Sequence, residues 1–238
     1  MQKLSLNGSS IVILLTMFRH FKKAIQSIES YLWGVKLKTY NSKLNGRLEL
    51  WLINNHKVLN SAHANQSFDS MHLIFQKVFR ETAIKNKPIK NLLLLGLGCG
   101  SIPTILFDEL HIDCKITAID HDETMLQIAN DHFNIHRFKN LNIVIDDALK
   151  YVDDCSSTFD LIIVDLFYDD QVPEKFLERT FIQNVSSLLS PKGLLVFNMI
   201  TQTKHQKERF DELHNYFSHA DVIKANGSNS IIVHHKQQ

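Results

Sequence analysis

Cysteine is scarce in this sequence of 238 residues, which contains only three. Cys99, Cys114 and Cys155 form no CxxC pair, so neither a disulfide framework nor a cysteine-ligated zinc site organises the fold. The thirteen histidines are scattered, and the HExxH spacing of a zinc enzyme is absent. We therefore expect no metal site. Free thiols fit a reducing compartment, so we expect a cytoplasmic protein.

The sequence also lacks an excess of charge of either sign. It has 26 basic and 25 acidic residues, and a net charge of +1 favours neither a nucleic acid nor a membrane surface as partner. The apolar stretch at residues 11–18 is too short to span a bilayer. The basic segment "RHFKK" follows it without a small-residue cleavage site, which argues against a signal peptide. We expect a small-molecule substrate, no nucleic acid and no membrane.

Apolar residues, in contrast, are plentiful: they make up 44% of the chain and include 15 phenylalanines, enough for a substantial core. Residues 17–32 repeat apolar side chains at helical spacing, and we assign residues 1–34 to a helical extension. "RLELWLINNHKVLNS" alternates apolar and polar residues around Asn54-Asn55, which predicts a β-hairpin. We assign residues 35–87 to this hairpin module and a connecting helix, and residues 88–238 to a catalytic domain.

Strands and helices alternate regularly after Pro88. Strands are expected near 91–96, 115–120, 141–145, 159–165, 193–199, 220–225 and 230–235, with helices near 102–110, 122–134, 174–189 and 203–218. Continuous apolar strands separated by helices indicate a parallel sheet covered on both faces. Only "NGSN" separates the last two strands, so they should pair antiparallel. The predicted fold is α/β and Rossmann-like, with a mostly parallel seven-stranded sheet and an antiparallel terminal hairpin. This is the arrangement of class I S-adenosylmethionine-dependent methyltransferases.

Three glycines at every second position follow the first strand of this sheet. Ligands of such sheets bind at the carboxyl ends of the strands, where Gly96, Gly98 and Gly100 would let a nucleotide approach the backbone. A helix that begins near Ser101 would point its free N–H groups at the same place. The fingerprint of dinucleotide-binding proteins needs a glycine at its sixth position, where this chain has Ser101. The glycine motif alone, however, distinguishes a dinucleotide poorly from another nucleotide ligand. A tight turn without a ligand is a further interpretation.

Three aspartates stand at the ends of successive strands, in phase with the glycine loop. Asp120 ends the second strand, where a carboxylate can accept hydrogen bonds from both ribose hydroxyls. Asp147 follows the third strand, where a carboxylate can accept the adenine amino group, and Asp165 ends the fourth. Any one of them could be a helix cap, but three in succession favour adenosine as the ligand, carried by a sulfonium compound.

The order of these motifs resembles that of the spermidine synthase (polyamine aminopropyltransferase) family over residues 35–200. The similar segments, in chain order, are the hairpin module, "ANQSFDSMH", "LLLLGLGCGS", "AIDHDETMLQIANDHF", "IDDALKYV" and "FDLIIVDLF". The resemblance implies S-adenosylmethionine, or its decarboxylated form, as cofactor. It also implies that Asp120 binds ribose, that Asp147 binds adenine and that Asp165 is the catalytic carboxylate beside the attacking amine. A homodimer is expected by the same analogy.

The departures from that family concern the acceptor. Tyr168 stands where the family has a second aspartate, Phe68 where it has a tyrosine, and Cys99 where an aspartate receives the aminopropyl ammonium. A buried dication without carboxylate partners is costly, so these departures argue against a diamine acceptor. Tyr168, Asp169 and Gln66 are the expected substrate-binding residues, although a solvated turn explains the Tyr-Asp-Asp run equally well.

The function predicted from the sequence is a spermidine-synthase-like transfer of a methyl group, and less favourably of an aminopropyl group, to an unidentified amine. Asp165 would accept or orient the proton of that amine, and Asn198 is a further residue at the rim. Three alternatives stay open: a genuine polyamine aminopropyltransferase, a nicotinamide-dependent oxidoreductase, and a non-catalytic nucleotide-binding module.

Overall fold

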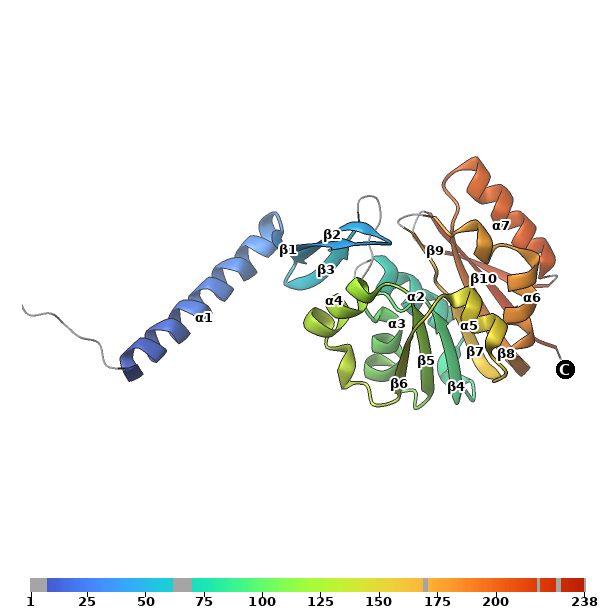
Figure 1. Cartoon of the computed structure of the whole chain (residues 1–238), viewed down its shortest axis with the longest axis horizontal. Helices are drawn as coiled ribbons and strands as arrows, with labels where there is room; N and C mark the ends of the chain where they lie inside the picture. The colour runs from blue at the N-terminus through green and yellow to red at the C-terminus, as the bar shows by residue number, and fades with distance from the viewer. Residues whose placement is uncertain (1–7, 62–69, 169–170, 218, 226–227, 238) are drawn as a thin grey trace, which may run out of the picture.

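A computed structural model describes residues 8–61, 70–168, 171–217, 219–225 and 228–237 (Figure 1). It begins with the long helix α1 (Gly8–Leu32), which starts earlier than the periodicity at residues 17–32 indicated. Within the described ranges, no helix combines the length and hydrophobicity needed to cross a membrane. The domain boundaries expected near residues 34 and 87 stay predictions.

Helix α1 stands away from the rest of the molecule (Figure 1). The apolar side chains that predicted it are exposed, among them Phe18 at 71% and Phe21 at 67%. Ser30, near the end of the helix, is buried: its carbonyl accepts the N–H of Asn54 and its Oγ accepts the N–H of Asn55. The exposed apolar stripe therefore lies on the side of the helix away from this contact.

The smaller sheet contains the predicted hairpin. Strands β2 (Gly46–Ile53) and β3 (His56–Asn60) pair antiparallel around Asn54-Asn55, whose φ values of 49° and 62° are left-handed. Asparagine tolerates this conformation, which a two-residue hairpin turn with matching twist requires. The structure adds a third strand, β1 (Val35–Ser42), which pairs antiparallel with β2 and which the sequence pattern did not indicate.

The main sheet has seven strands in the order β6-β5-β4-β7-β8-β10-β9. Their bounds are β4 (Asn91–Leu95), β5 (Lys115–Asp120), β6 (Leu141–Ile145), β7 (Phe159–Val164), β8 (Leu189–Ile200), β9 (Asp221–Ala225) and β10 (Asn229–His235). The first five pair in parallel, and β10 runs antiparallel to both β8 and β9. The predicted fold is confirmed.

The leucine run of β4 shows why the sheet is buried on both faces. Leu92 and Leu94 join one core cluster, and Leu93 and Leu95 join another on the opposite face. Because successive side chains of a strand point to opposite faces, a strand covered on both sides must be apolar throughout. One face is covered by α2 (Ser70–Glu81), α3 (Ser101–Thr104) and α4 (Glu123–Phe133), and the other by α5 (Ala148–Asp154), α6 (Arg179–Ser187) and α7 (Lys204–Tyr216).

Two helices differ from the sequence prediction. The helix expected over residues 174–189 is divided into a single turn, η4 (Glu174–Phe176), and α6, because Glu178 adopts an extended conformation between them. Helix α5 was not predicted. It is only seven residues long, and the Asp147 side chain caps it by accepting the N–H of Leu149. The remaining short helices are η1 (Ile84–Asn86), η2 (Ile105–Glu109) and η3 (Ile135–Arg137).

The smaller sheet packs on α4 and on the glycine loop. Leu48 and Leu50 of β2 form a cluster with Cys99 and with Met125 and Ile128 of α4. This contact places the turn between β1 and β2 above the carboxyl ends of the main strands (Figure 1).

Candidate functional site

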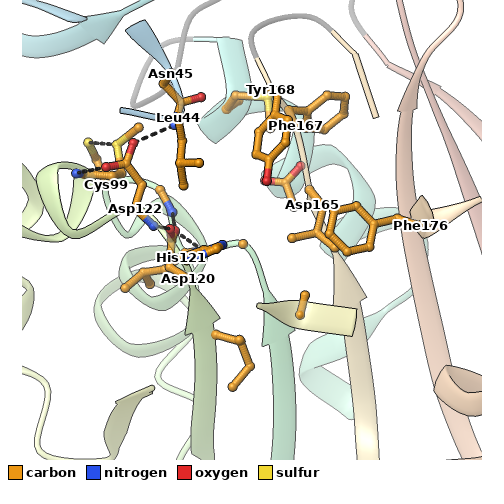
Figure 2. Close-up of a pocket in the computed structure, with 18 of the residues that line it drawn as sticks. Leu44, Asn45, Cys99, Asp120, His121, Asp122, Asp165, Phe167, Tyr168 and Phe176 are labelled. Atoms are coloured by element: carbon orange, nitrogen blue, oxygen red, sulfur yellow. Dashed lines mark hydrogen bonds between the residues drawn. The ribbon is translucent and has the colours of Figure 1, made fainter. Parts of the chain in front are cut away.

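A cavity of about 250 Å³ lies at the carboxyl ends of β4, β5 and β7. This is the place where a ligand binds in an open parallel sheet. The β1–β2 turn contributes Leu44 and Asn45 to its wall, and Asp122 ties this turn to the main domain (Figure 2). The Asp122 carboxylate accepts hydrogen bonds from Ser42 Oγ and from Asn45 Nδ2, and it also caps α4 by accepting two backbone N–H groups.

The glycine loop lines this cavity, and the three glycines all have positive φ values. Gly96 is required by the packing of the sheet, because a Cβ there would overlap the carbonyl oxygen of Asp165. Gly100 is required as well, since a Cβ would lie 2.5 Å from Ile135 Cγ2. The glycines therefore allow the loop to pack closely on its neighbours as well as keeping side chains out of the cavity. Gly98 and Gly96 line the cavity itself, and their role in binding a cofactor stays a prediction, as does that of Gly100.

Asp120 lies beneath the glycine loop at the end of β5. Its Oδ2 accepts the N–H groups of Leu97 and Gly98 at 3.0 and 3.1 Å, and its Oδ1 accepts the N–H of Asp122 at 3.0 Å. Burial raises the pKa of Asp120, and the three backbone N–H groups counteract that rise. Asp120 thus holds the loop in shape. The contact with ribose hydroxyls predicted for it stays a prediction.

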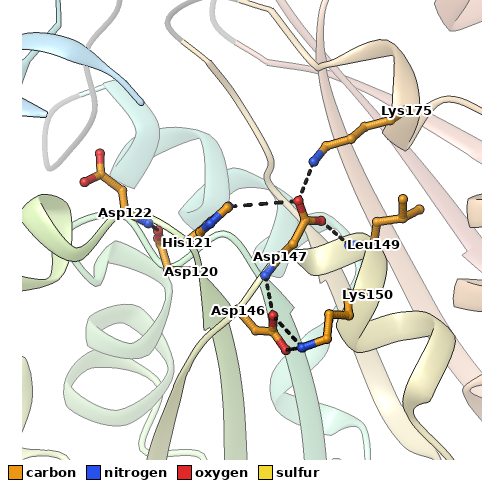
Figure 3. A network of polar contacts seen from close by, with 8 residues as sticks. All are labelled: Asp120, His121, Asp122, Asp146, Asp147, Leu149, Lys150 and Lys175. Atoms are coloured by element: carbon orange, nitrogen blue, oxygen red, sulfur yellow. Dashed lines mark hydrogen bonds and ion pairs between the residues drawn. The ribbon is translucent and has the colours of Figure 1, made fainter. Parts of the chain in front are cut away.

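Asp147 lies at the start of α5, close to His121, the neighbour of Asp120 (Figure 3). Lys175 Nζ donates to Asp147 Oδ2 at 2.5 Å, and His121 Nδ1 lies 3.9 Å from the same oxygen. Partial burial raises the pKa of Asp147, but the hydrogen bonds from Lys175 and Leu149 outweigh it, and the net pKa is lowered. The carboxylate is therefore ionised and faces the cavity, and its predicted contact with adenine is untested.

Asp165, directly after β7, is the third predicted acid of the site. Burial raises its pKa from 3.8 to about 7, against the opposing effect of a hydrogen bond from Asn198 Nδ2 to Asp165 Oδ1 at 2.9 Å. Asn198 is fully buried on β8, and its own Oδ1 accepts a hydrogen bond from Asn229 Nδ2 at 3.0 Å. A carboxyl group with a pKa near neutrality, at the rim of a ligand cavity, can accept a proton from an amine.

The chain after β7 forms the aromatic side of the cavity. Phe167, Tyr168 and Phe176 line it together with Asp165 (Figure 2). The backbone of Tyr168 forms an isolated antiparallel bridge with Gln171, and the tyrosine side chain is 38% exposed. The other two residues predicted to bind substrate, Asp169 and Gln66, lie outside the described residues, as does Phe68.

Several lining residues were missed by the sequence analysis. Asn45, His121, Asp146 and Asn229 all border the cavity. His121 and Asp146 are direct neighbours of Asp120 and Asp147, so their position next to predicted strand ends was a signal that could have identified them. Asn45 lies in the β1–β2 turn and Asn229 begins β10, both far from the motifs, and no pattern in the chain points to them. Among the described residues, no group of three or more potential metal ligands occurs.

Comparisons with known proteins agree with this geometry. A family model described as a methyltransferase domain matches residues 88–231. The chain is 30% identical over 138 residues to the eEF1A lysine and N-terminal methyltransferase homolog of Drosophila melanogaster, which covers 54% of this chain and 20% of that protein. It is 26% identical over 153 residues to the polyamine aminopropyltransferase of Vibrio vulnificus (strain CMCP6). This match covers 62% of this chain and 51% of that protein. The chain thus spans about a fifth of the first relative and half of the second.

Solved structures share the fold. Human methyltransferase-like protein 13 in complex with SAH matches with a TM-score of 0.56 and 24% identity, over 71% of this chain and 79% of that one. Spermidine synthase from Thermotoga maritima matches with a TM-score of 0.70 and 15% identity, over 84% of this chain and 72% of that one. At these identities the likeness is one of fold.

Proposed function

The chain belongs to the methyltransferase domain family, and we propose that it transfers the methyl group of S-adenosylmethionine to a single amine, such as the side-chain amine of a lysine in a protein. The membership agrees with the sequence-based prediction of a group transferase that uses S-adenosylmethionine. The observation that carries the proposal is Asp165, a partly buried carboxyl group that lines the cavity and whose pKa burial raises to about 7.

The residues of the cavity fit S-adenosylmethionine. The carboxylates of Asp120 and Asp147 face the same space from two strand ends, at positions suited to ribose hydroxyls and to the adenine amino group. The glycine loop, at the end of the neighbouring strand β4, lets the nucleoside lie close to the backbone. When bound, S-adenosylmethionine supplies a methyl group on a sulfonium, which is itself the activated leaving group.

Cys99 favours S-adenosylmethionine over its decarboxylated form. The thiol is 2% exposed and lies 3.8 Å from the sulfur of Met125. An aspartate at this position, as in the spermidine synthases, would repel the carboxylate of S-adenosylmethionine and attract only an ammonium. A neutral thiol removes that repulsion. The chain therefore has lost the charge that would select an aminopropyl donor.

The side of the cavity that would bind the acceptor suits a molecule with a single amine at the end of an apolar chain. It is formed by Met71 and Phe75 of α2, by Phe167 and Phe176, and by Asp165, which is the only carboxylate on this side among the described residues. An aliphatic chain can pass along the aromatic rings while its terminal amine meets Asp165. A diamine would need a second acid for its second charge. The name of the Drosophila relative, a lysine and N-terminal methyltransferase, agrees with an amine acceptor on a protein.

The chain's residues supply alignment and a proton acceptor. Asp165 takes the proton that the attacking amine must lose, because an ammonium has no lone pair with which to attack the methyl carbon. The nitrogen–carbon bond forms as the carbon–sulfur bond breaks, and the bonding electron pair stays on sulfur. Asn198 holds Asp165 in place by its hydrogen bond. The walls contributed by Leu44 and Phe167 restrict water at the reacting atoms.

Aminopropyl transfer is the second candidate, because the chain is also similar to a polyamine aminopropyltransferase over more than half its length. Isothermal titration with S-adenosylmethionine, its decarboxylated form, methylthioadenosine and the nicotinamide dinucleotide separates the candidates. We expect S-adenosylmethionine to bind most tightly. Preference for the decarboxylated form would support the second candidate, and binding of the dinucleotide would revive an oxidoreductase.

Transfer itself is tested with a labelled methyl group. Lysine-containing protein extracts and putrescine serve as acceptors, with Asp165→Asn as the matched variant. We expect label in protein and a loss of at least about a hundredfold in the variant, the usual contribution of a general base. Equal transfer by the variant would contradict the role of Asp165, and a chain that binds S-adenosylmethionine but labels no acceptor would indicate a non-catalytic module.

A further inference from the structure

Asn229 has no part in the reaction described above, yet it lines the cavity. It begins β10, opposite Ile200 of β8, and is 7% exposed. Its Nδ2 donates to Asn198 Oδ1 at 3.0 Å, and Asn198 Nδ2 donates to Asp165 Oδ1 at 2.9 Å. Asn229 of β10, Asn198 of β8 and Asp165, directly after β7, thus form one line of hydrogen bonds that ends at the proposed base.

The direction of this line matters because an asparagine amide can present either its oxygen or its nitrogen to a neighbour. Asn229 donates to the oxygen of Asn198, so the NH2 group of Asn198 is the end that faces Asp165. A donor at that place stabilises the carboxylate, whereas an oxygen there would stabilise the protonated acid. Ser228 in turn donates to Asn229 Oδ1 at 3.3 Å, which fixes the orientation of Asn229.

We propose that Asn229 is a positioning residue that keeps Asp165 able to accept a proton by holding the Asn198 amide with its donor end toward the carboxylate. The proposal rests on the function proposed above. Asn229 acts through Asn198, and its side chain donates a hydrogen bond to Asn198 and accepts one from Ser228.

The surroundings of Asp165 leave the amide as the group that opposes burial. Burial raises the pKa of Asp165, the Asn198 hydrogen bond lowers it, and within the described part of the chain no charged group contributes to the shift. The other titratable groups that line the cavity are Asp120, His121, Asp122, Asp146, Asp147 and Tyr168. Turning the Asn198 amide therefore removes the one interaction that favours the ionised form.

The test is the pH dependence of methyl transfer in Asn229→Ala. The acid limb of kcat should move to higher pH by roughly half a unit to one unit, while the KM for S-adenosylmethionine and the plateau at high pH change less than about twofold. Ser230→Ala is the matched control: Ser230 is the next residue of β10, equally buried, and its hydroxyl contacts Thr201 and Lys224 instead. Its acid limb should stay in place.

A second measurement keeps the proposal separate from the proposed function. Titration of the Asp165 carboxyl carbon by NMR, in the protein without S-adenosylmethionine, reports the pKa whether or not transfer is found. We expect a higher pKa in Asn229→Ala than in the wild type and an intermediate one in Asn229→Ser, which keeps a smaller donor. An unchanged pKa in both variants, or an equal shift in Ser230→Ala, would overturn the proposal even if methyl transfer is established.

Discussion

Asp165→Asn should stabilise the fold at alkaline pH while it removes the proposed base. The folded-state pKa of Asp165 is raised from 3.8 to about 7, so the folded protein prefers the protonated acid. Its contribution to stability is therefore fully present below about pH 4 and is lost as the pH rises through about 7. Asparagine resembles the protonated form at every pH, so the variant escapes this loss.

The size of the effect follows from the shift. A difference of about 3 pKa units corresponds to about 4 kcal/mol at full ionisation, of which about 3 kcal/mol falls between pH 5 and pH 8.5. The new amide carries an NH2 group that has to find a buried partner, which costs about 1–3 kcal/mol at any pH. The change in ΔΔG between the two pH values is free of that constant cost, and it is the quantity to measure.

Thermal or urea unfolding of the wild type and the variant at both pH values provides the assay. For a chain of this size, about 3 kcal/mol corresponds to a relative shift in Tm of roughly 6–12 °C in favour of the variant at the higher pH. Asp160→Asn, on the strand β7 that precedes Asp165, is the contrasting control. Hydrogen bonds from Lys90, Asn91 and Ser190 outweigh burial and lower the pKa of Asp160. This carboxylate is therefore ionised in both the folded and the unfolded chain at the two pH values, and the effect of Asp160→Asn on stability should be the same at both. A pH-independent Tm difference for Asp165→Asn would refute the reasoning.

Three further predictions concern the same region. Cys99→Asp should weaken the binding of S-adenosylmethionine at least about tenfold relative to the binding of its decarboxylated form, measured by titration, because an added carboxylate repels that of the ligand. An unchanged ratio of the two affinities would mean that Cys99 does not select the donor. Gly96→Ala should cost several kcal/mol more in urea unfolding than Gly46→Ala, since both glycines have positive φ but only at Gly96 would a Cβ overlap backbone; equal costs would leave backbone strain alone as the cause. Asp122→Ala should destabilise by about 2 kcal/mol or more, because it removes a helix cap and two hydrogen bonds to the β1–β2 turn, whereas the exposed cap Thr203→Ala should cost about 1 kcal/mol; similar losses at the two caps would show that the turn is held by other contacts.

The sheet could be predicted because its signals are local. The leucines of β4 form a continuous apolar run that only a strand covered on both faces requires, and the same holds for β7 and β8. Strand β1 was not predicted because its alternation of exposed and less exposed side chains changes phase after Lys38, next to an irregularity in its pairing with β2. Helix α5 was not predicted because its seven residues are too few to show a helical periodicity. Asp147, which caps this helix, was interpreted as a ligand-binding residue instead.

The chain itself determined the order of the motifs. Three glycines after an apolar strand and three aspartates at successive strand ends are properties of short segments, and parallel pairing brings the ends of those segments to one edge. That much of the site, including Asp120 and Asp165, follows from the sequence because each position depends only on its neighbours along the chain.

Only the tertiary structure decided how these groups behave. The pKa of Asp165 depends on burial by elements from the whole domain, and no residue next to it in the chain reports that burial. Asn198 and Asn229 are 31 residues apart, and they meet because β10 turns back along β8. Asn45 reaches the cavity because Asp122 draws the β1–β2 turn onto it, 77 residues away in sequence. Long-range contacts of this kind leave no periodic pattern in a sequence, so the raised pKa of Asp165 and the hydrogen bonds that hold it are visible only in the folded chain.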